Sequence, residues 1–138
     1  YREPASAFVA DFVGKVNRLR AVAEGDHWFR LGDKRLQCRP EADAGCGAGD
    51  EVALYLRPED RVVDGLREDD PLRCAGTVRQ VEFLGGNCLA EIAIDGIPDQ
   101  PVQLQFSLNQ MDEFNVREGG TVHFALRSDR LRAFPVHA

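Results

Sequence analysis

The sequence predicts a mostly β protein, built as one or two antiparallel β-barrels with a single short helix at the N-terminal end. Three observations support this prediction. Short apolar segments with alternating polar residues follow one another along most of the chain, clusters of Gly, Pro and Asp separate them, and only one segment has the spacing of an amphipathic helix. A parallel sheet needs crossover helices between its strands, which this pattern does not provide.

The predicted helix occupies the first part of the chain. Its apolar residues recur at helical spacing, Pro4 suits the first turn of a helix, and Gly14 stands where a C-cap is expected. The apolar positions are Phe8, Val9, Phe12 and Val13. This face is more often part of a core than a binding surface, although part of it could be exposed in an excised domain.

Strands are predicted from residue 17 onward. Residues 17–25 form the first, and residues 27–38 form a hairpin with its turn at Gly32-Asp33. A loop rich in Gly, Ala and Asp covers 40–50, and the strand that follows at 51–57 ends at Pro58, which lacks the N–H that a ladder requires.

The second half repeats this pattern of strand and turn. An acidic loop at 63–71 precedes a long hairpin at 72–94 with its turn at Gly85-Gly86. Residues 101–108 alternate apolar and polar side chains, and 117–135 read as two strands around a Ser128-Asp129 turn. The loop at 64–71 is the expected boundary if the chain folds as two sub-barrels.

The composition restricts the class of partner. The 138 residues carry 17 Lys and Arg against 23 Asp and Glu, a net charge of −6, whereas sequence-independent nucleic-acid binding needs a surplus of clustered positive charge. Lysine occurs only at positions 15 and 34, so nearly all positive charge is guanidinium, which favours planar pairing with carboxylates.

The four cysteines follow no metal-ligand or redox spacing. Their irregular positions favour reduced, mostly buried thiols over a disulfide framework, although one disulfide pair remains an alternative. They are Cys38, Cys46, Cys74 and Cys88. The chain has neither an apolar run of about 18 residues, as a membrane span requires, nor a signal-peptide pattern.

No catalytic constellation stands out. His27, His123 and His137 lack a ligand at a familiar spacing, so we expect no metal site. The acidic residues 68–70 lie in a hydrophilic loop, whereas paired-acid catalysis needs burial. The serines, Ser6, Ser107 and Ser128, have no nucleophile-elbow setting.

Four phrases in order resemble a known family. YREPASAFVADFVGKVN at 1–17 is similar to the segment that follows the nucleotide-binding domain in ATP-binding subunits of polyamine, ferric-iron, 2-aminoethylphosphonate and maltose-type ABC importers. LYLRPED at 54–60 and GTVRQVEFLGG at 76–86 resemble the transport-associated, oligonucleotide/oligosaccharide-binding-like (TOBE) domain of those subunits, and LRAFP at 131–135 resembles their C-terminal strand.

The resemblance implies a regulatory module of a larger ATPase. Residues 1–16 are then a linker helix from an absent ATPase core, and 17–138 are the TOBE-type, OB-like β domain. The phosphate loop and signature sequences are missing, so the resemblance implies no catalytic residue, cofactor or metal in this chain, with ATP and Mg in the parent domain.

The partners implied are its own ATPase domain, a second ATP-binding subunit in a homodimer and, through the parent, the membrane permease subunits. The resemblance implies no nucleic acid and no direct membrane insertion. The expected place is cytoplasmic, peripheral at the inner face of the bacterial inner membrane. The Arg57, Glu59 and Asp60 side chains, beside the bend at Pro58, are the candidate interdomain or dimer contact, with a self-contained local turn as the alternative.

A second candidate cluster comprises Trp28, Phe29 and Arg30. These could form a ligand or interface patch of the kind OB-like barrels use, although strand alternation places Trp28 and Phe29 on opposite faces, which favours packing. Two other functions stay open at this point. One is a domain that senses an oxyanion or another small solute, and the other is a nucleic-acid-binding OB domain, which the acidity disfavours.

Overall fold

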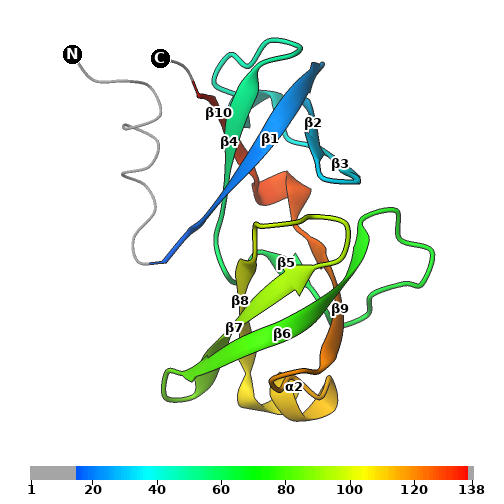
Figure 1. Cartoon of the computed structure of the whole chain (residues 1–138), viewed down its shortest axis with the longest axis vertical. Coiled ribbons are helices and arrows are strands. Elements are labelled where there is room, and N and C mark those ends of the chain that lie inside the picture. The colour runs from blue at the N-terminus through cyan, green and yellow to red at the C-terminus, as the bar shows by residue number, and fades with distance from the viewer. Residues whose placement is uncertain (1–14, 137–138) are drawn as a thin grey trace. The chain divides into compact units, whose positions relative to one another are not determined.

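The computed structural model describes residues 15–136 and divides into two units of comparable size (Figure 1). Within the described residues, unit 1 comprises 15–57 and 127–136, and unit 2 comprises 58–126. Each described unit contains one five-stranded antiparallel sheet. The expected helix at Pro4–Val13 lies outside the described residues.

The sheet of unit 1 has the strand order β10-β4-β1-β2-β3. Its central strand is β1, which pairs with β4 on one side and with β2 on the other. A one-turn 3-10 helix, η1, follows β3, and a second, η2, precedes β10. The elements are β1 (Asn17–Gly25), β2 (Trp28–Leu31), β3 (Lys34–Gln37), η1 (Pro40–Ala42), β4 (Glu51–Leu56), η2 (Ser128–Arg130) and β10 (Arg132–Pro135).

Alternation along β1 separates the core face of this sheet from its outer face. Leu19, Ala21 and Ala23 are buried, whereas Arg18 and Arg20 between them are exposed. The neighbouring strands add apolar side chains to the same core, because directly opposed residues of an antiparallel pair share a face. They include Phe29, Leu31, Leu36, Leu54, Leu56 and Ala133.

The sheet of unit 2 has the order β5-β9-β6-β7-β8. Strands β6 and β7 form a long hairpin, with a bulge in β6 between Val78 and Gln80. The elements are β5 (Arg61–Val62), β6 (Arg73–Phe83), β7 (Asn87–Ile94), β8 (Val102–Ser107), the helix α2 (Leu108–Glu113) and β9 (Thr121–Leu126).

A capping box starts α2 at the end of β8. The Ser107 hydroxyl accepts from the Gln110 N–H at 3.0 Å, and the Gln110 amide oxygen accepts from the Ser107 N–H at 3.0 Å. The alternating face expected for residues 102–108 therefore ends one residue early. Phe106 is fully buried, whereas Leu108 is 47% exposed on the helix.

The mostly β class and the antiparallel pairing are confirmed. A closed barrel is not shown, because no ladder joins the first and last strands of either described sheet, although an isolated bridge links Asp43 to Ala133 on the edge strand β10. The α-helix within the described residues lies at Leu108–Glu113 and not at the N-terminal end. The two strands expected around Ser128-Asp129 do exist, but β9 belongs to the sheet of unit 2 and β10 to that of unit 1.

Candidate functional site

A hydrogen bond joins the turn between β1 and β2 to the loop before β4. The Nδ1–H of His27 donates to Oδ2 of Asp43 at 2.8 Å, and the Asp43 side chain is only 5% exposed. The other carboxylate oxygen accepts from the backbone N–H groups of Gly45 and Cys46 at 3.1 and 2.9 Å. Asp43 therefore holds the loop in one conformation and fixes the orientation of the His27 ring.

These contacts determine the charge state of Asp43. Burial alone raises the pKa of a carboxyl group, but the hydrogen bonds from the Cys46 N–H and from His27 outweigh it, so the pKa of Asp43 lies below its usual value. The same carboxylate, together with burial, acts on the neighbouring thiols. Burial first, and the Asp43 charge second, raise the pKa of Cys38 to about 11 and of Cys46 to about 12.

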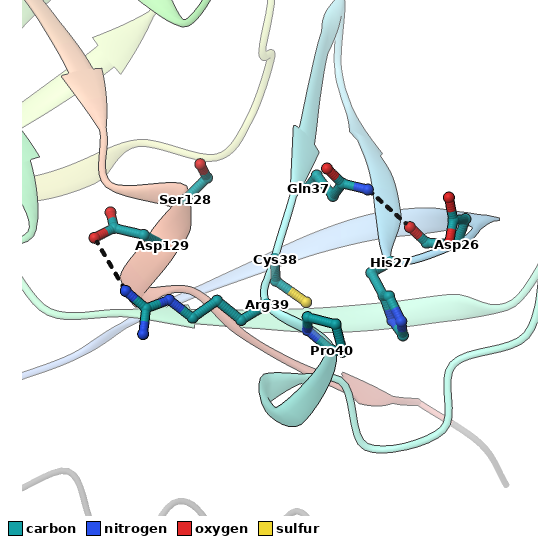
Figure 2. Close-up of a pocket in the computed structure, with 8 residues that line it drawn as sticks. All are labelled: Asp26, His27, Gln37, Cys38, Arg39, Pro40, Ser128 and Asp129. Atoms are coloured by element: carbon teal, nitrogen blue, oxygen red, sulfur yellow. Dashed lines mark hydrogen bonds and ion pairs between the residues drawn. The ribbon is translucent and has the colours of Figure 1, made fainter.

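A pocket of about 450 Å³ lies beside this pair in unit 1 (Figure 2). Arg39 lies 3.9 Å from the carboxylate of Asp129, and the Gln37 amide donates to the Asp26 carbonyl at 3.1 Å. The lining residues are Asp26, His27, Gln37, Cys38, Arg39, Pro40, Ser128 and Asp129. Among the described residues no group of three or more His, Cys, Asp or Glu side chains could hold a metal ion.

The candidate cluster at 28–30 is divided between the two faces of the sheet of unit 1. Phe29 is 1% exposed and belongs to the core, whereas Trp28 and Arg30 lie on the outer face. There the guanidinium of Arg35 stacks over the Trp28 ring, 4.6 Å from its centroid. The patch on this face therefore consists of Trp28, Arg30 and Arg35, without Phe29.

The segment around Pro58 lies at the division between the units. Arg57 is half-buried, Glu59 is exposed and Asp60 is 6% exposed. A short turn follows the proline, in which the Arg61 N–H donates to the Glu59 carbonyl at 2.9 Å. Their role as an interdomain or dimer contact stays a prediction.

Arg61, the next residue, organises a polar network in unit 2 that the sequence analysis did not identify. Its Nε donates to the Gln105 carbonyl at 2.7 Å and its Nη2 to the Gln110 amide oxygen at 2.8 Å. The Gln110 amide nitrogen in turn donates to Asp64 at 2.6 Å. The only hint in the sequence is an arginine directly after the RPED phrase.

A sequence profile of the TOBE domain matches residues 54–134, more than half of the chain. This chain belongs to the TOBE domain family. The match includes the Pro58 bend, the Arg61 network and the whole sheet of unit 2. Within it, the GTVRQVEFLGG phrase is the outgoing strand and turn of the β6–β7 hairpin.

The TOBE chain matches C-terminal regions of ATP-binding proteins of ABC importers. It is 33% identical over 92 residues to the spermidine/putrescine import ATP-binding protein PotA of Aliivibrio fischeri, covering 62% of this chain and 24% of that protein. It is 28% identical over 141 residues to the sulfate/thiosulfate import ATP-binding protein CysA 2 of Chromobacterium violaceum, covering 100% of this chain and 37% of that protein. The chain thus spans well under half the length of these relatives.

A solved structure shares the fold. The cytoplasmic molybdate-binding protein ModG, with molybdate bound, superposes with a TM-score of 0.67 over 85% of this chain and 94% of its own, at 15% sequence identity. The described residues contain no helix that is both long and apolar enough to cross a membrane.

Proposed function

We propose that this chain is the non-catalytic, C-terminal regulatory and dimerisation domain of an ABC import ATPase subunit. The observation that carries the proposal is the alignment of the whole chain with a sulfate/thiosulfate import ATP-binding protein of which it covers 37%. The rest of such a protein is where ATP and Mg would bind. The domain would act in the cytoplasm at the inner face of the membrane, beside its ATPase core, a second subunit and the permease.

The physical role is a fixed contact between two ATPase subunits. When the catalytic halves open and close, a contact that persists elsewhere keeps them at high effective concentration, so each cycle needs no new encounter. A ligand or protein that binds this contact in one state more tightly than in the other shifts the ATPase equilibrium. We also propose that each sheet closes into an OB-like barrel, as the sequence predicts.

A chimera tests the proposal. Residues 1–138 replace the aligned region of the Chromobacterium violaceum relative, and solute uptake and ATPase activity are compared with the intact protein and with a truncated protein that ends before the graft. We expect the graft to restore subunit association and part of the uptake that truncation removes. A chimera no better than the truncated protein would reject the proposal.

A second candidate function is binding of a small oxyanion. The pocket of unit 1 favours it by offering the His27 ring, the Gln37 amide and the Arg39 guanidinium, and a protein of the same fold, ModG, is described as molybdate-binding. Asp26 and Asp129 in the same lining oppose an anion. Calorimetric titration of the chain with molybdate and with sulfate decides this, because saturable heat that Arg39→Gln removes would support the oxyanion function.

A further inference from the structure

The two units carry opposite net charge. The described residues of unit 1 contain 11 Lys and Arg against 8 Asp and Glu, whereas those of unit 2 contain 5 against 13. The chain as a whole has a net charge of −6, but its two described units differ in sign, with about +3 on unit 1 and about −8 on unit 2. Opposite charges of this size attract at the ionic strength of a cell and are screened at high salt.

Four arginines of unit 1 lie together on one sheet face. Arg18 and Arg20 project from β1 on the side opposite to the core, and Val22, Arg30 and Arg35 stand directly opposite one another on β1, β2 and β3. Tyr55 lies on the same side because it stands directly opposite Arg18. Trp28 lies there as well, because it is two residues before Arg30 on β2. We name this surface the arginine face, with the members Arg18, Arg20, Val22, Trp28, Arg30, Arg35 and Tyr55.

Several of these side chains are held in place. The Arg18 Nε donates to the Tyr55 hydroxyl at 3.1 Å, and Glu24 accepts from Arg30 at 2.7 Å and from Arg35 at 2.6 Å. One carboxylate thus aligns two guanidinium groups, which remain 59% and 53% exposed and keep a surplus positive charge. Ordered, exposed arginines beside an aromatic ring lose little side-chain entropy when they bind a partner.

The densest negative charge of unit 2 lies in an exposed loop. The acidic loop, residues 64–70, contains Asp64, Glu68, Asp69 and Asp70 against one arginine, Arg67. Asp69 is 79% exposed and its pairing with Arg67 is at the surface, where such a pair adds little stability. Glu68 and Asp69 therefore present exposed carboxylates to a partner, whereas Asp64 and Asp70 already accept hydrogen bonds from the Gln110 amide and the Leu72 N–H.

We propose that the arginine face of one chain docks the acidic unit 2 of a second copy, with the acidic loop as the nearest element. The inference rests on the proposed dimerisation role and names the surface that carries it. Charge complementarity favours a second copy, since each chain brings both halves of the contact. A nucleic acid would meet the same arginines but would be repelled by a unit of about −8.

Sedimentation velocity of the 138-residue chain at low and high salt is the first test. We expect reversible self-association whose dissociation constant rises at least about tenfold between 50 and 300 mM NaCl. The face variant Arg18→Glu/Arg20→Glu should weaken association at low salt at least about tenfold. The milder variant Arg18→Gln/Arg20→Gln should also weaken association while its circular dichroism spectrum stays unchanged. This result would show that the loss of association is not caused by a folding defect.

The matched control is Lys15→Glu/Arg130→Glu. It removes the same charge from unit 1 at exposed positions outside the arginine face, and we expect association within about twofold of the unchanged chain. The loop variant Glu68→Arg/Asp69→Arg should fail to self-associate and should form a heterodimer when mixed with the face variant. Equal weakening by control and face variants, or no rescue in the mixture, overturns the proposal.

Other outcomes are equally informative. A chain that is monomeric at all salt concentrations overturns the surface proposal, whereas the chimera described above can still restore uptake, so the two failures are distinguishable. A salt-sensitive shift of single-stranded DNA that the face variant abolishes, without self-association, would assign the arginine face to nucleic acid and overturn the second-copy proposal.

Discussion

His27 lies in a left-handed backbone conformation with its ring held 2.8 Å from the carboxylate of Asp43, on a loop 16 residues further along the chain. Asp26 and His27, with φ of 54° and 65°, are the central residues of the turn between β1 and β2. This turn type favours Asn-Gly or Asp-Gly, because most side chains are strained at positive φ. The link to Asp43 explains how a histidine is accommodated there.

Replacing Asp43 should destabilise unit 1. Asp43→Ala removes the acceptor of three N–H groups, those of His27, Gly45 and Cys46, and we expect a loss of about 2–3 kcal/mol in the free energy of unfolding. Urea denaturation followed by circular dichroism measures it. Glu41→Ala, exposed in the same loop, is the control and should stay within about 0.5 kcal/mol. Equal losses would show that Asp43 does not hold the loop.

The same carboxylate makes stability depend on pH. The folded-state pKa of Asp43 lies below the unfolded value of about 3.9, so its contribution is present above that value and is lost as pH falls through the folded pKa. Asp129, whose pKa is lowered by the hydrogen bond from Arg127, acts in the same direction. The thermal midpoint should fall steeply below about pH 4. Asp43→Ala should flatten this fall, and parallel curves for the two proteins would contradict the assignment.

Much of the fold was predictable because the strands are amphipathic. The strand at 17–25, the hairpin turn at Gly32-Asp33 and the long hairpin turning at Gly85-Gly86 all agree with the structure. In each case the signal in the sequence is local, because apolar and polar residues alternate along the strand and a turn-forming residue stands at its end. The RPED phrase and the GTVRQVEFLGG phrase also identified the family correctly.

The site was less predictable, because it depends on contacts between distant residues. Nothing near His27 in the sequence indicates Asp43, and nothing near Arg61 indicates Gln105 or Gln110. The two-residue strand β5 and the one-and-a-half-turn helix α2 are too short for a periodic signal. Local patterns also cannot assign β9 and β10 to different sheets, since that choice depends on tertiary pairing.

The thiols should react slowly in the native state. Burial raises the pKa of Cys38, Cys46 and Cys88, to about 11 and about 12 for the first two, so little thiolate exists at neutral pH. Titration with an aromatic disulfide reagent at pH 7.5 should show all four cysteines only after denaturation. A thiol that reacts within seconds in the folded chain would contradict this, and Cys46→Ser would test whether the half-buried residue is responsible.

The planar guanidinium group of Arg61, and not only its positive charge, should be needed for the stability of unit 2. Arg61→Lys keeps a cation but cannot donate to both the Gln105 carbonyl and the Gln110 amide, so we expect a loss of about 1–3 kcal/mol in the free energy of unfolding. Arg67→Lys, at a side chain that is 73% exposed, is the matched control and should be nearly neutral. If both substitutions cost the same, the network contributes no more than a surface charge.

Gly76, the first residue of the GTVRQVEFLGG phrase, should tolerate no side chain. A Cβ there would overlap the Cγ2 of Ile92 and lie 2.9 Å from the Ala93 carbonyl oxygen, which belongs to the paired strand and cannot move without disturbing the ladder. We expect Gly76→Ala to lower the free energy of unfolding by about 1–3 kcal/mol, as overpacking of a core does.

Gly86, near the tip of the same hairpin, provides the matched comparison. A Cβ at this position meets no atom within 4 Å, and its backbone does not require a glycine by φ, so Gly86→Ala should change stability by no more than about 0.5 kcal/mol. Urea denaturation of both variants measures the difference. Since both substitutions reduce backbone freedom in the unfolded chain equally, only the close approach of β7 to Gly76 separates them. Equal stability of the two variants would mean that β6 and β7 lie further apart than the structure places them.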